Sequence, residues 1–216
     1  MPSSVTRRGR VTMVDPPATL GIVSKTIGFE IAGSYERVVD NVGPPADPRR
    51  EKARRMLGWD SVLFIPLYVA SYCAVGVLLA RRDYGGTRWL GLVIVAAAVL
   101  TASLDFAENR RSERLLDAGP GPQTDDLARS ARSASLLKWA AAFSTTALCS
   151  VPFLVEGGLW RTLVGAGVLF AAFTGLLAVL LNLRQWAPGM LAFAFQLTGL
   201  AVAGALAAAI VLEVNA

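Results

Sequence analysis

The residues best suited to chemistry are carboxylate and amide side chains that stand beside long uncharged stretches. Asp60 comes directly before one such stretch, and Asp105 comes directly after the next. Asp105, Glu108 and Asn109 follow one another at i, i+3 and i+4, which places them on one face of a helix. Oxygen-rich groups of this kind bind cations or protons, and at a lipid interface they also serve as acids and bases.

Two further side chains extend this group to a candidate polar site. Tyr68 lies two helical turns after Asp60 on the same face, and Arg184 ends a later uncharged stretch at the depth expected for Asp105. Because consecutive spans are antiparallel, these side chains are expected to converge, with Arg184 as the cation that pairs with Asp105. Glu30 reaches them only if its own segment folds back. The candidate polar site consists of Asp60, Tyr68, Asp105, Glu108, Asn109 and Arg184.

Ordinary local salt bridges are the alternative to chemistry at these positions. Glu108 has Arg111 one turn ahead of it, and Asp60 has Arg55 about one turn behind it. The sequence contains no histidine, which removes the commonest zinc ligand and the usual axial ligand of haem. We therefore assign no catalytic residue, no metal site and no cofactor.

Five uncharged stretches provide the elements that must position the site. Only 17% of the residues are charged, against about 25% in ordinary soluble domains. The stretches are residues 61–80, 89–104, 139–155, 162–183 and 185–212. Since a helix needs about 20 apolar residues to cross a bilayer, the sequence predicts an all-α polytopic bundle of about five transmembrane spans. This composition excludes a soluble globular enzyme.

Tryptophans and basic residues predict the orientation of the spans. Each of the five tryptophans lies within three residues of the start of an uncharged stretch, where indole rings prefer the membrane interface. With the N-terminus inside, 17 of the 21 lysines and arginines fall on the cytoplasmic side. The positive-inside rule therefore predicts a multi-pass protein of a bacterial inner membrane, with a cytoplasmic N-terminus and an external C-terminus.

The remaining segments are polar or amphipathic. Residues 22–42 carry isoleucine and valine at helical spacing, interrupted by Glu30, Arg37 and Asp40, which is typical of an amphipathic helix on the membrane surface. Glycines and prolines at 119–122 break the chain between the second and third spans. The expected organisation is a disordered tail (1–17), an amphipathic surface segment (18–46), a long helix pair forming spans 1 and 2 (47–118), a cytoplasmic linker (119–134) and a three-span bundle (135–216).

A cluster of basic residues precedes the first span. Its members are Arg49, Arg50, Lys52, Arg54 and Arg55. Such a cluster binds anionic lipid headgroups at roughly 1 kcal/mol per charge. Because basic flanks are the usual consequence of membrane insertion, no nucleic-acid partner is expected. The expected partners are membrane lipids, with a partner subunit or a second copy of the chain.

Three short strings resemble a known group of proteins. They are FEIAGS at residues 29–34, WD followed by FIPLY at residues 59–68, and LDFAEN at residues 104–109. They resemble the F-E-L-A-G, D-x-x-F-x-x-x-Y and L-D-x-x-E-N pattern of a loose group of uncharacterised bacterial integral membrane proteins, although this chain has one more residue between Asp60 and Phe64. The resemblance covers roughly residues 29–111. It implies no activity, because the group has no assigned function. It implies that one site contains Glu30, Asp60, Tyr68, Asp105, Glu108 and Asn109.

Three functions fit these features. The first is an accessory or scaffold protein that binds lipid or a partner subunit. This function requires the least chemistry from the polar side chains. The second is a small transporter or channel with a cation or proton site at its cytoplasmic end, for which the outer halves of the spans show no polar run. The third is an enzyme that acts on lipid headgroups through interfacial carboxylates. The sequence favours the scaffold and a non-enzymatic role.

Overall fold

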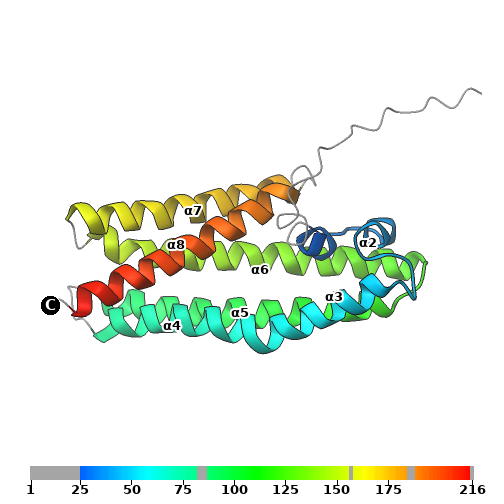
Figure 1. Ribbon diagram of the computed structural model, residues 1–216, viewed down its shortest axis with the longest axis horizontal. Coiled ribbons are helices and arrows are strands. Elements are labelled where there is room, and N and C mark those ends of the chain that lie inside the picture. The colour runs from blue at the N-terminus through cyan, green and yellow to red at the C-terminus, as the bar shows by residue number, and fades with distance from the viewer. Residues whose placement is uncertain (1–24, 82–86, 156–157, 184–187, 215–216) are drawn as a thin grey trace, which may run out of the picture.

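The structure is a computed structural model that describes residues 25–81, 87–155, 158–183 and 188–214. Within these ranges all regular elements are helices. Residues 25–30 are helical, and after them come α2 (Tyr35–Val42), α3 (Pro48–Trp59), the π-helix η1 (Asp60–Phe64), α4 (Ile65–Arg81), α5 (Thr87–Asp117), α6 (Pro122–Val155), α7 (Leu159–Leu183) and α8 (Pro188–Val214) (Figure 1).

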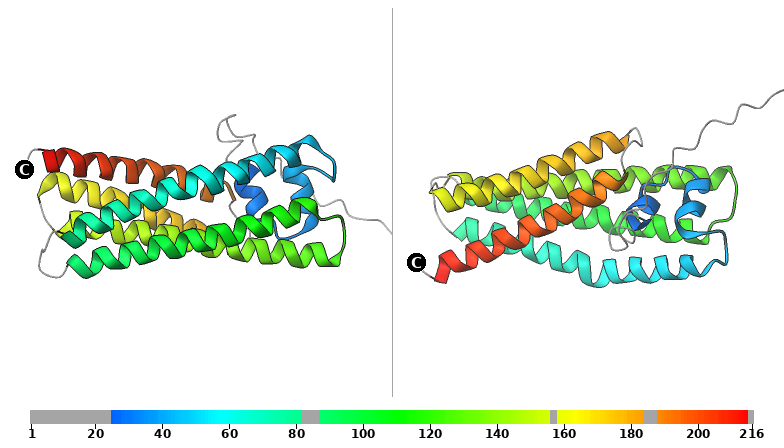
Figure 2. Two further views of the ribbon diagram at one scale, coloured as in Figure 1. Left: turned by 90° about the horizontal axis from the view of Figure 1, so that it is seen from below. Right: turned by 45° about the horizontal axis from the view of Figure 1, so that its top comes forward.

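The long helices form an antiparallel bundle. Four helical rods of the described chain are long and apolar enough to cross a membrane: Pro48–Arg81, Arg88–Asp117, Pro122–Val155 and Leu159–Leu183. A shorter apolar part, Gly189–Gly204, lies within α8, which crosses the bundle obliquely (Figure 2). The expectation of an all-α, multi-pass membrane bundle of about five spans is confirmed. The side of the membrane on which the N-terminus lies stays a prediction.

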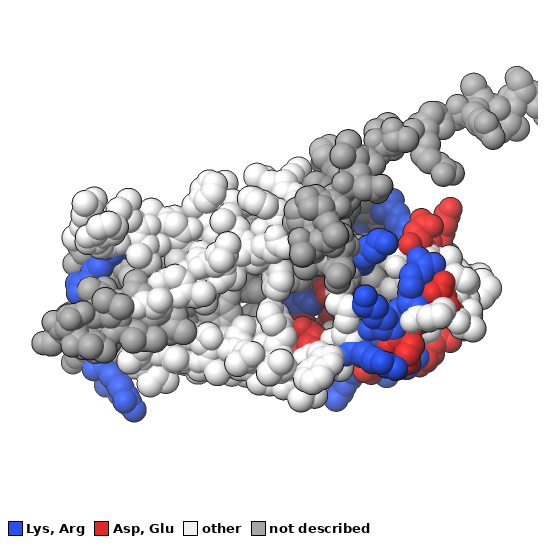
Figure 3. All heavy atoms as spheres, viewed as in Figure 1, with Lys and Arg blue, Asp and Glu red and all other residues white. Residues whose placement is uncertain are grey.

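Several helices are longer than a membrane requires. The rod formed by α3, η1 and α4 has 34 residues, or about 51 Å at 1.5 Å per residue, whereas the hydrocarbon core is about 30 Å thick. Figure 3 shows that acidic and basic side chains gather at the end of the molecule that carries α2 and α3. We call this end the polar extension; it comprises α2, α3, residues 106–117 of α5 and residues 122–137 of α6.

The N-terminal segment packs on the bundle instead of forming one helix on a membrane surface. The single helix expected over residues 22–42 is broken between residues 30 and 35, where Ser34 caps α2. Ile27 and Ile31 are buried against α6, α7 and α8, and Val38 is buried in the core of the polar extension. The apolar face predicted for lipid therefore contacts protein. The tail predicted for residues 1–17 lies outside the described residues.

The structure corrects the linker expected over residues 119–134, because α6 already begins at Pro122. Proline is well suited to a first helical turn, since its missing N–H would have no helical partner there. Asp125 accepts a hydrogen bond from the backbone N–H of Tyr35 on α2, at 2.8 Å. Ala128 and Ala131 are buried in the core of the extension. Small side chains thus let α6 pack within the polar extension before it enters the apolar bundle.

Glycines bring neighbouring helices into close contact. Gly76 of α4 and Gly91 of α5 pack backbone to backbone, and a Cβ atom on either would collide with the carbonyl oxygen of the other. On α7, a Cβ atom at Gly175 would collide with the ring of Phe143 on α6. These contacts set the rotation of α4 and α7 about their axes, and therefore which side chains point into the bundle.

Candidate functional site

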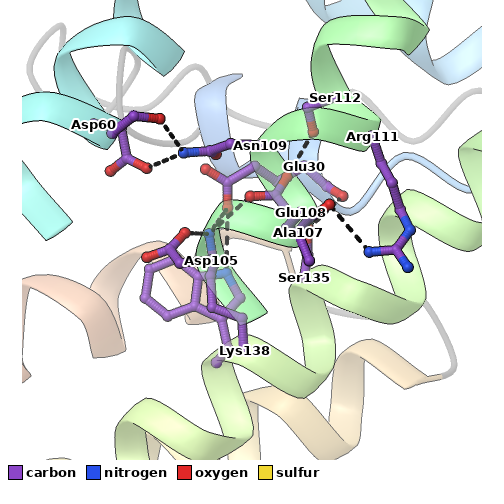
Figure 4. Close-up of polar contacts among 12 residues, drawn as sticks. Glu30, Asp60, Asp105, Ala107, Glu108, Asn109, Arg111, Ser112, Ser135 and Lys138 are labelled. Carbon is purple, nitrogen blue, oxygen red and sulfur yellow. Dashed lines mark hydrogen bonds and ion pairs between the residues drawn. The ribbon is translucent and has the colours of Figure 1, made fainter. Parts of the chain in front are cut away.

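One buried lysine is the centre of the polar site. Lys138 of α6 lies where the polar extension meets the apolar bundle, and only 5% of its surface is exposed. Its Nζ atom is 3.0 Å from Oδ1 of Asp105 and 3.1 Å from Oε2 of Glu108, both on α5. Oε2 of Glu30, from the N-terminal segment, lies 3.3 Å from the same nitrogen (Figure 4). Three acidic residues from two segments therefore share one ammonium group.

A second group of polar side chains joins the site from the first rod. Asn109 donates from Nδ2 to Oδ2 of Asp60 at 2.8 Å and to Oγ of Ser61 at 3.0 Å. Tyr68 donates its hydroxyl hydrogen to Oδ2 of Asp105 at 3.0 Å. The π-helix η1 begins at Asp60, and such wide turns commonly occur at functional sites. We call the five ionisable residues Glu30, Asp60, Asp105, Glu108 and Lys138 the carboxylate–lysine cluster.

Neighbouring side chains hold the carboxylates in place. Oγ of Ser112 donates to Oε1 of Glu108 at 2.6 Å, one helical turn away. Trp139 donates from Nε1 to Oε2 of Glu30 at 3.3 Å, and Ser135 donates to the backbone oxygen of Glu30 at 3.0 Å. Ser135, Lys138 and Trp139 are spaced i, i+3 and i+4, so one face of α6 fixes the N-terminal segment.

The cluster has more acids than cations. Among the described residues it contains four carboxyl groups and one ammonium group, and Arg111 points away from it to donate to the backbone oxygen of Ala107 (Figure 4). Buried charges without partners are costly, so a protein neutralises them by binding protons or another cation. Burial raises the pKa of Glu30 to about 8, opposed by Lys138 and reinforced by Glu108, Asp105 and Asp60.

We expect Glu30 to make stability fall as the pH rises. Its pKa is about 8 in the folded protein, against an ordinary value of 4.5, so the folded state binds the extra proton between these values. The stabilisation is complete below pH 4.5 and is lost as the pH rises through about 8. Unfolding by SDS in bicelles, measured between about pH 5 and pH 8.5, should show this slope in the unchanged protein and a smaller slope in Glu30→Gln.

Asp47→Asn is the matched control for that measurement. Hydrogen bonds from Arg49 lower the pKa of the partly exposed Asp47 below 3.8, so this carboxyl group does not titrate in the measured range. Asp47→Asn should keep the full pH slope. An unchanged slope in Glu30→Gln would contradict the assignment of the proton to Glu30.

A line of buried hydroxyl groups continues from the cluster into the apolar bundle. The hydroxyl oxygen of Tyr72 lies 2.6 Å from Oγ1 of Thr146, and Oγ1 of Thr101 lies 3.5 Å from Oγ1 of Thr145. The first contact joins α4 to α6, and the second joins α5 to α6. Hydroxyl groups commonly hold membrane helices together in this way. They also supply polar side chains within the spans, next to the part of the bundle that holds the cluster.

The structure brings together five of the six residues of the candidate polar site, namely Asp60, Tyr68, Asp105, Glu108 and Asn109. Glu30 also joins them, because its segment folds back onto the bundle. Arg184 lies outside the described residues. In the described part of the chain, Asp105 pairs with Lys138. The sequence pattern marks Lys138 only as a basic residue at the membrane boundary.

Lys138 had a recognisable signal in the sequence. Like Asp60 and Asp105, it borders an uncharged stretch on the predicted cytoplasmic side, so depth alone makes it as good a partner for Asp105 as Arg184. Ser112, Ser135 and Trp139 were also missed as site residues. Tryptophan is common at membrane interfaces, and nothing in the spacing of the three residues singled them out.

The basic cluster predicted to bind lipid contains one buried member. Arg50 donates from Nε to the backbone oxygen of Gly43 at 3.0 Å, and from Nη1 to that of Leu116 at 2.6 Å. Burial and these bonds correct its assignment: Arg50 ties α3 to the end of α5. The other four basic residues are exposed, and three of them form salt bridges: Arg49 with Asp47, Arg54 with Asp117, and Arg55 with Glu51.

Comparison with known proteins adds no further assignment. No protein-family model matches the sequence, and no curated protein or solved structure is significantly similar to it. Within the described part of the chain, no group of three or more acidic, cysteine or histidine side chains is arranged to hold a metal ion. The fold and the site define a multi-pass membrane protein with an ionisable cluster buried inside its helical bundle.

Proposed function

We propose that the protein is a small transporter whose carboxylate–lysine cluster binds and releases protons on their way across the membrane. The observation that carries this proposal is the imbalance of the cluster: among the described residues, three carboxylates share the buried Lys138, and a fourth, Asp60, joins them through Asn109. Ionisable residues inside membrane proteins are rare, and they commonly mark proton or ion pathways.

A scaffold has less need of such a cluster. Desolvating each ion costs several kcal/mol, and well-packed apolar residues often give equal or greater stability. The enzyme alternative also has less support, because Asp105 and Glu108 pair with the buried Lys138 and almost no surface of either is exposed. An enzyme that acts on headgroups held at the membrane interface needs carboxylates exposed at that interface. Proton binding requires only that the cluster exchange protons with its surroundings.

The polar extension supports a second, anchoring role in an inner membrane with the N-terminus in the cytoplasm. Arg49, Lys52, Arg54 and Arg55 are exposed on α3, immediately before the apolar part of the first rod. Anionic headgroups attract basic residues at this position. The salt bridges of the three arginines with acidic neighbours reduce this attraction, so we assign the lipids to anchoring and the buried cluster to transport.

Proton entry into proteoliposomes tests the proposed transport. A potassium diffusion potential, negative inside, should drive protons into vesicles that contain the protein faster than into empty vesicles, as reported by a trapped pH-sensitive dye. Asp105→Asn should reduce entry by about tenfold or more, because the site loses a charge that binds the proton. Asp105 is the right target, since it contacts both Lys138 and Tyr68.

Asp117→Asn is the matched control, because Asp117 is an exposed carboxylate that pairs with Arg54 on the polar extension. It should leave proton entry unchanged. Entry no faster than in empty vesicles, or equal entry with Asp105→Asn, would contradict the proposal. If the Asp105→Asn variant unfolds in detergent in the same thermal transition as the unchanged protein, a loss of proton entry does not reflect misfolding.

A further inference from the structure

The side chain of Lys138 shows which kind of cation the cluster recognises. It is a primary ammonium group on an alkyl chain, and three carboxylates surround its nitrogen. The same nitrogen lies 5.0 Å from the centre of the Trp139 ring, within the range of a cation–π interaction. Carboxylates and an indole face together bind ammonium ions that carry an apolar body.

Aromatic side chains surround this part of the cluster. The ring of Phe195 on α8 lies 5.6 Å from that of Phe64 in η1 and 5.3 Å from that of Trp139. Phe64 in turn lies 5.6 Å from Tyr68, which donates to Asp105. We call these four residues, Phe64, Tyr68, Trp139 and Phe195, the aromatic wall. It joins the first rod to α6 and α8 directly beside the carboxylates.

The aromatic wall lies between the cluster and the outer face of the bundle. Phe64 is 41% exposed on a rod that spans the membrane, whereas Trp139 is buried beside Lys138. Figure 3 shows acidic and basic atoms recessed among uncharged ones, next to the polar extension and on the face that α8 crosses. The contact between Phe64 and Phe195 therefore marks the place where η1 and α8 meet beside the carboxylates.

An unpaired acceptor in the cluster favours a ligand that donates hydrogen bonds. Asn109 is only 4% exposed, and its Oδ1 atom has no hydrogen-bond partner, although its Nδ2 atom donates to Asp60 and Ser61. A buried acceptor without a donor destabilises the site, and the Oδ1 atom of Asn109 lies beside its carboxylates. The N–H groups of an ammonium ion would satisfy both the carboxylates and this oxygen.

We propose that the carboxylate–lysine cluster and the aromatic wall bind a primary ammonium ion with an apolar body, which enters between η1 and α8 and takes the place of the Lys138 ammonium beside Asp105. This inference deepens the proposed function and rests on it, because the same carboxylates bind protons and the organic cation competes with them. The apolar body packs against Phe64 and Phe195, and the ammonium group donates to Asp105, Asp60 and Asn109.

Binding of n-hexylammonium tests the inference. The protein is placed in phosphatidylcholine nanodiscs at about pH 7.5 and titrated calorimetrically with n-hexylammonium chloride, with hexan-1-ol as an uncharged probe of the same chain length. We expect the ammonium ion to bind at least about tenfold more tightly than the alcohol. A hydrogen bond between charged groups contributes roughly a tenfold increase in affinity. Binding should weaken as the pH falls, because protons occupy the same carboxylates.

Two pairs of variants locate the probe. Asp105→Asn should weaken n-hexylammonium binding by about tenfold or more, the effect of losing one charged acceptor, whereas Asp117→Asn should not change it. Phe195→Leu should weaken binding by about threefold, the smaller effect of a lost aromatic contact. Phe170→Leu is its control, because Phe170 is 64% exposed on α7 and no ring contact joins it to the site. Phe195→Leu leaves every charge of the cluster in place, so it tests the site even if Asp105→Asn does not fold.

Replacing phosphatidylcholine with phosphatidylethanolamine distinguishes two sources of the amine. A lipid amine as the natural occupant would lower the apparent affinity for n-hexylammonium in the second lipid, whereas a water-soluble amine would leave that affinity unchanged. Equal binding of n-hexylammonium and hexan-1-ol, or unchanged binding to both Asp105→Asn and Phe195→Leu, would overturn the inference. Proton entry into vesicles without amine binding would overturn this inference alone, whereas amine binding without proton entry would overturn only the proposed transport of protons.

Discussion

Lys138→Met should lower the free energy of unfolding by about 3–5 kcal/mol, the cost of leaving one side of a buried ion pair without its partner. Methionine fills a similar volume, so the loss reflects charge and not a cavity. Three carboxylates lose their shared ammonium group in this variant. SDS-induced unfolding in bicelles, followed by tryptophan fluorescence, measures the change.

A control and a rescue make this prediction specific. Lys52→Met removes an exposed lysine from α3 and should change stability by less than about 0.5 kcal/mol, as surface substitutions usually do. Adding Glu108→Gln to Lys138→Met should recover part of the loss, because one buried charge disappears with its partner. Equal stability of Lys138→Met and Lys52→Met would contradict the central role of Lys138.

Arg50→Met should cost about 3 kcal/mol, since each buried acceptor left without a donor costs about 1–3 kcal/mol. Its guanidinium group donates to backbone oxygens of Gly43 and Leu116, and also to that of Ala118 at 3.3 Å. These oxygens lie at the end of α5 and in the turn after α2. Their loss should loosen the polar extension, which limited proteolysis and SDS-induced unfolding both measure.

Arg49→Met is the matched control, because Arg49 is 51% exposed and pairs with Asp47 at the surface. Exposed salt bridges contribute about 0–1 kcal/mol, so this variant should be nearly as stable as the unchanged protein. If Arg50→Met were no less stable than Arg49→Met, the bonds from α3 to the end of α5 would be unimportant. The use of Arg50 as a lipid ligand would then regain support.

The sequence by itself determined the class of fold and much of the site. Uncharged stretches long enough to cross a membrane admit few structures other than helices, since every backbone polar group must be satisfied within the bilayer. Asp60 and Asp105 border two consecutive stretches, so an antiparallel pair of helices must bring them to one depth. The spacing of Asp105, Glu108 and Asn109 placed them on one face without any knowledge of packing.

Only the tertiary structure decided which cation those carboxylates meet. Depth in the membrane can be read from the boundaries of the uncharged stretches, and by depth Lys138 and Arg184 were equivalent. The rotation of each helix depends on side-chain packing, such as the ring of Phe143 against Gly175. That packing turns Lys138 toward Asp105 and Glu108, and no periodicity within a single helix encodes it.

The position of the N-terminal segment was also decided by tertiary contacts. An amphipathic helix has the same pattern whether its apolar face meets lipid or protein. Here Ile27 and Ile31 find an apolar surface on α6, α7 and α8, and Glu30 between them finds Lys138 and Trp139. A carboxylate between two isoleucines is costly on a lipid surface, but inside this bundle Lys138 and Trp139 satisfy it. These partners lie 108 and 109 residues away in the chain, so the local sequence pattern does not reveal them.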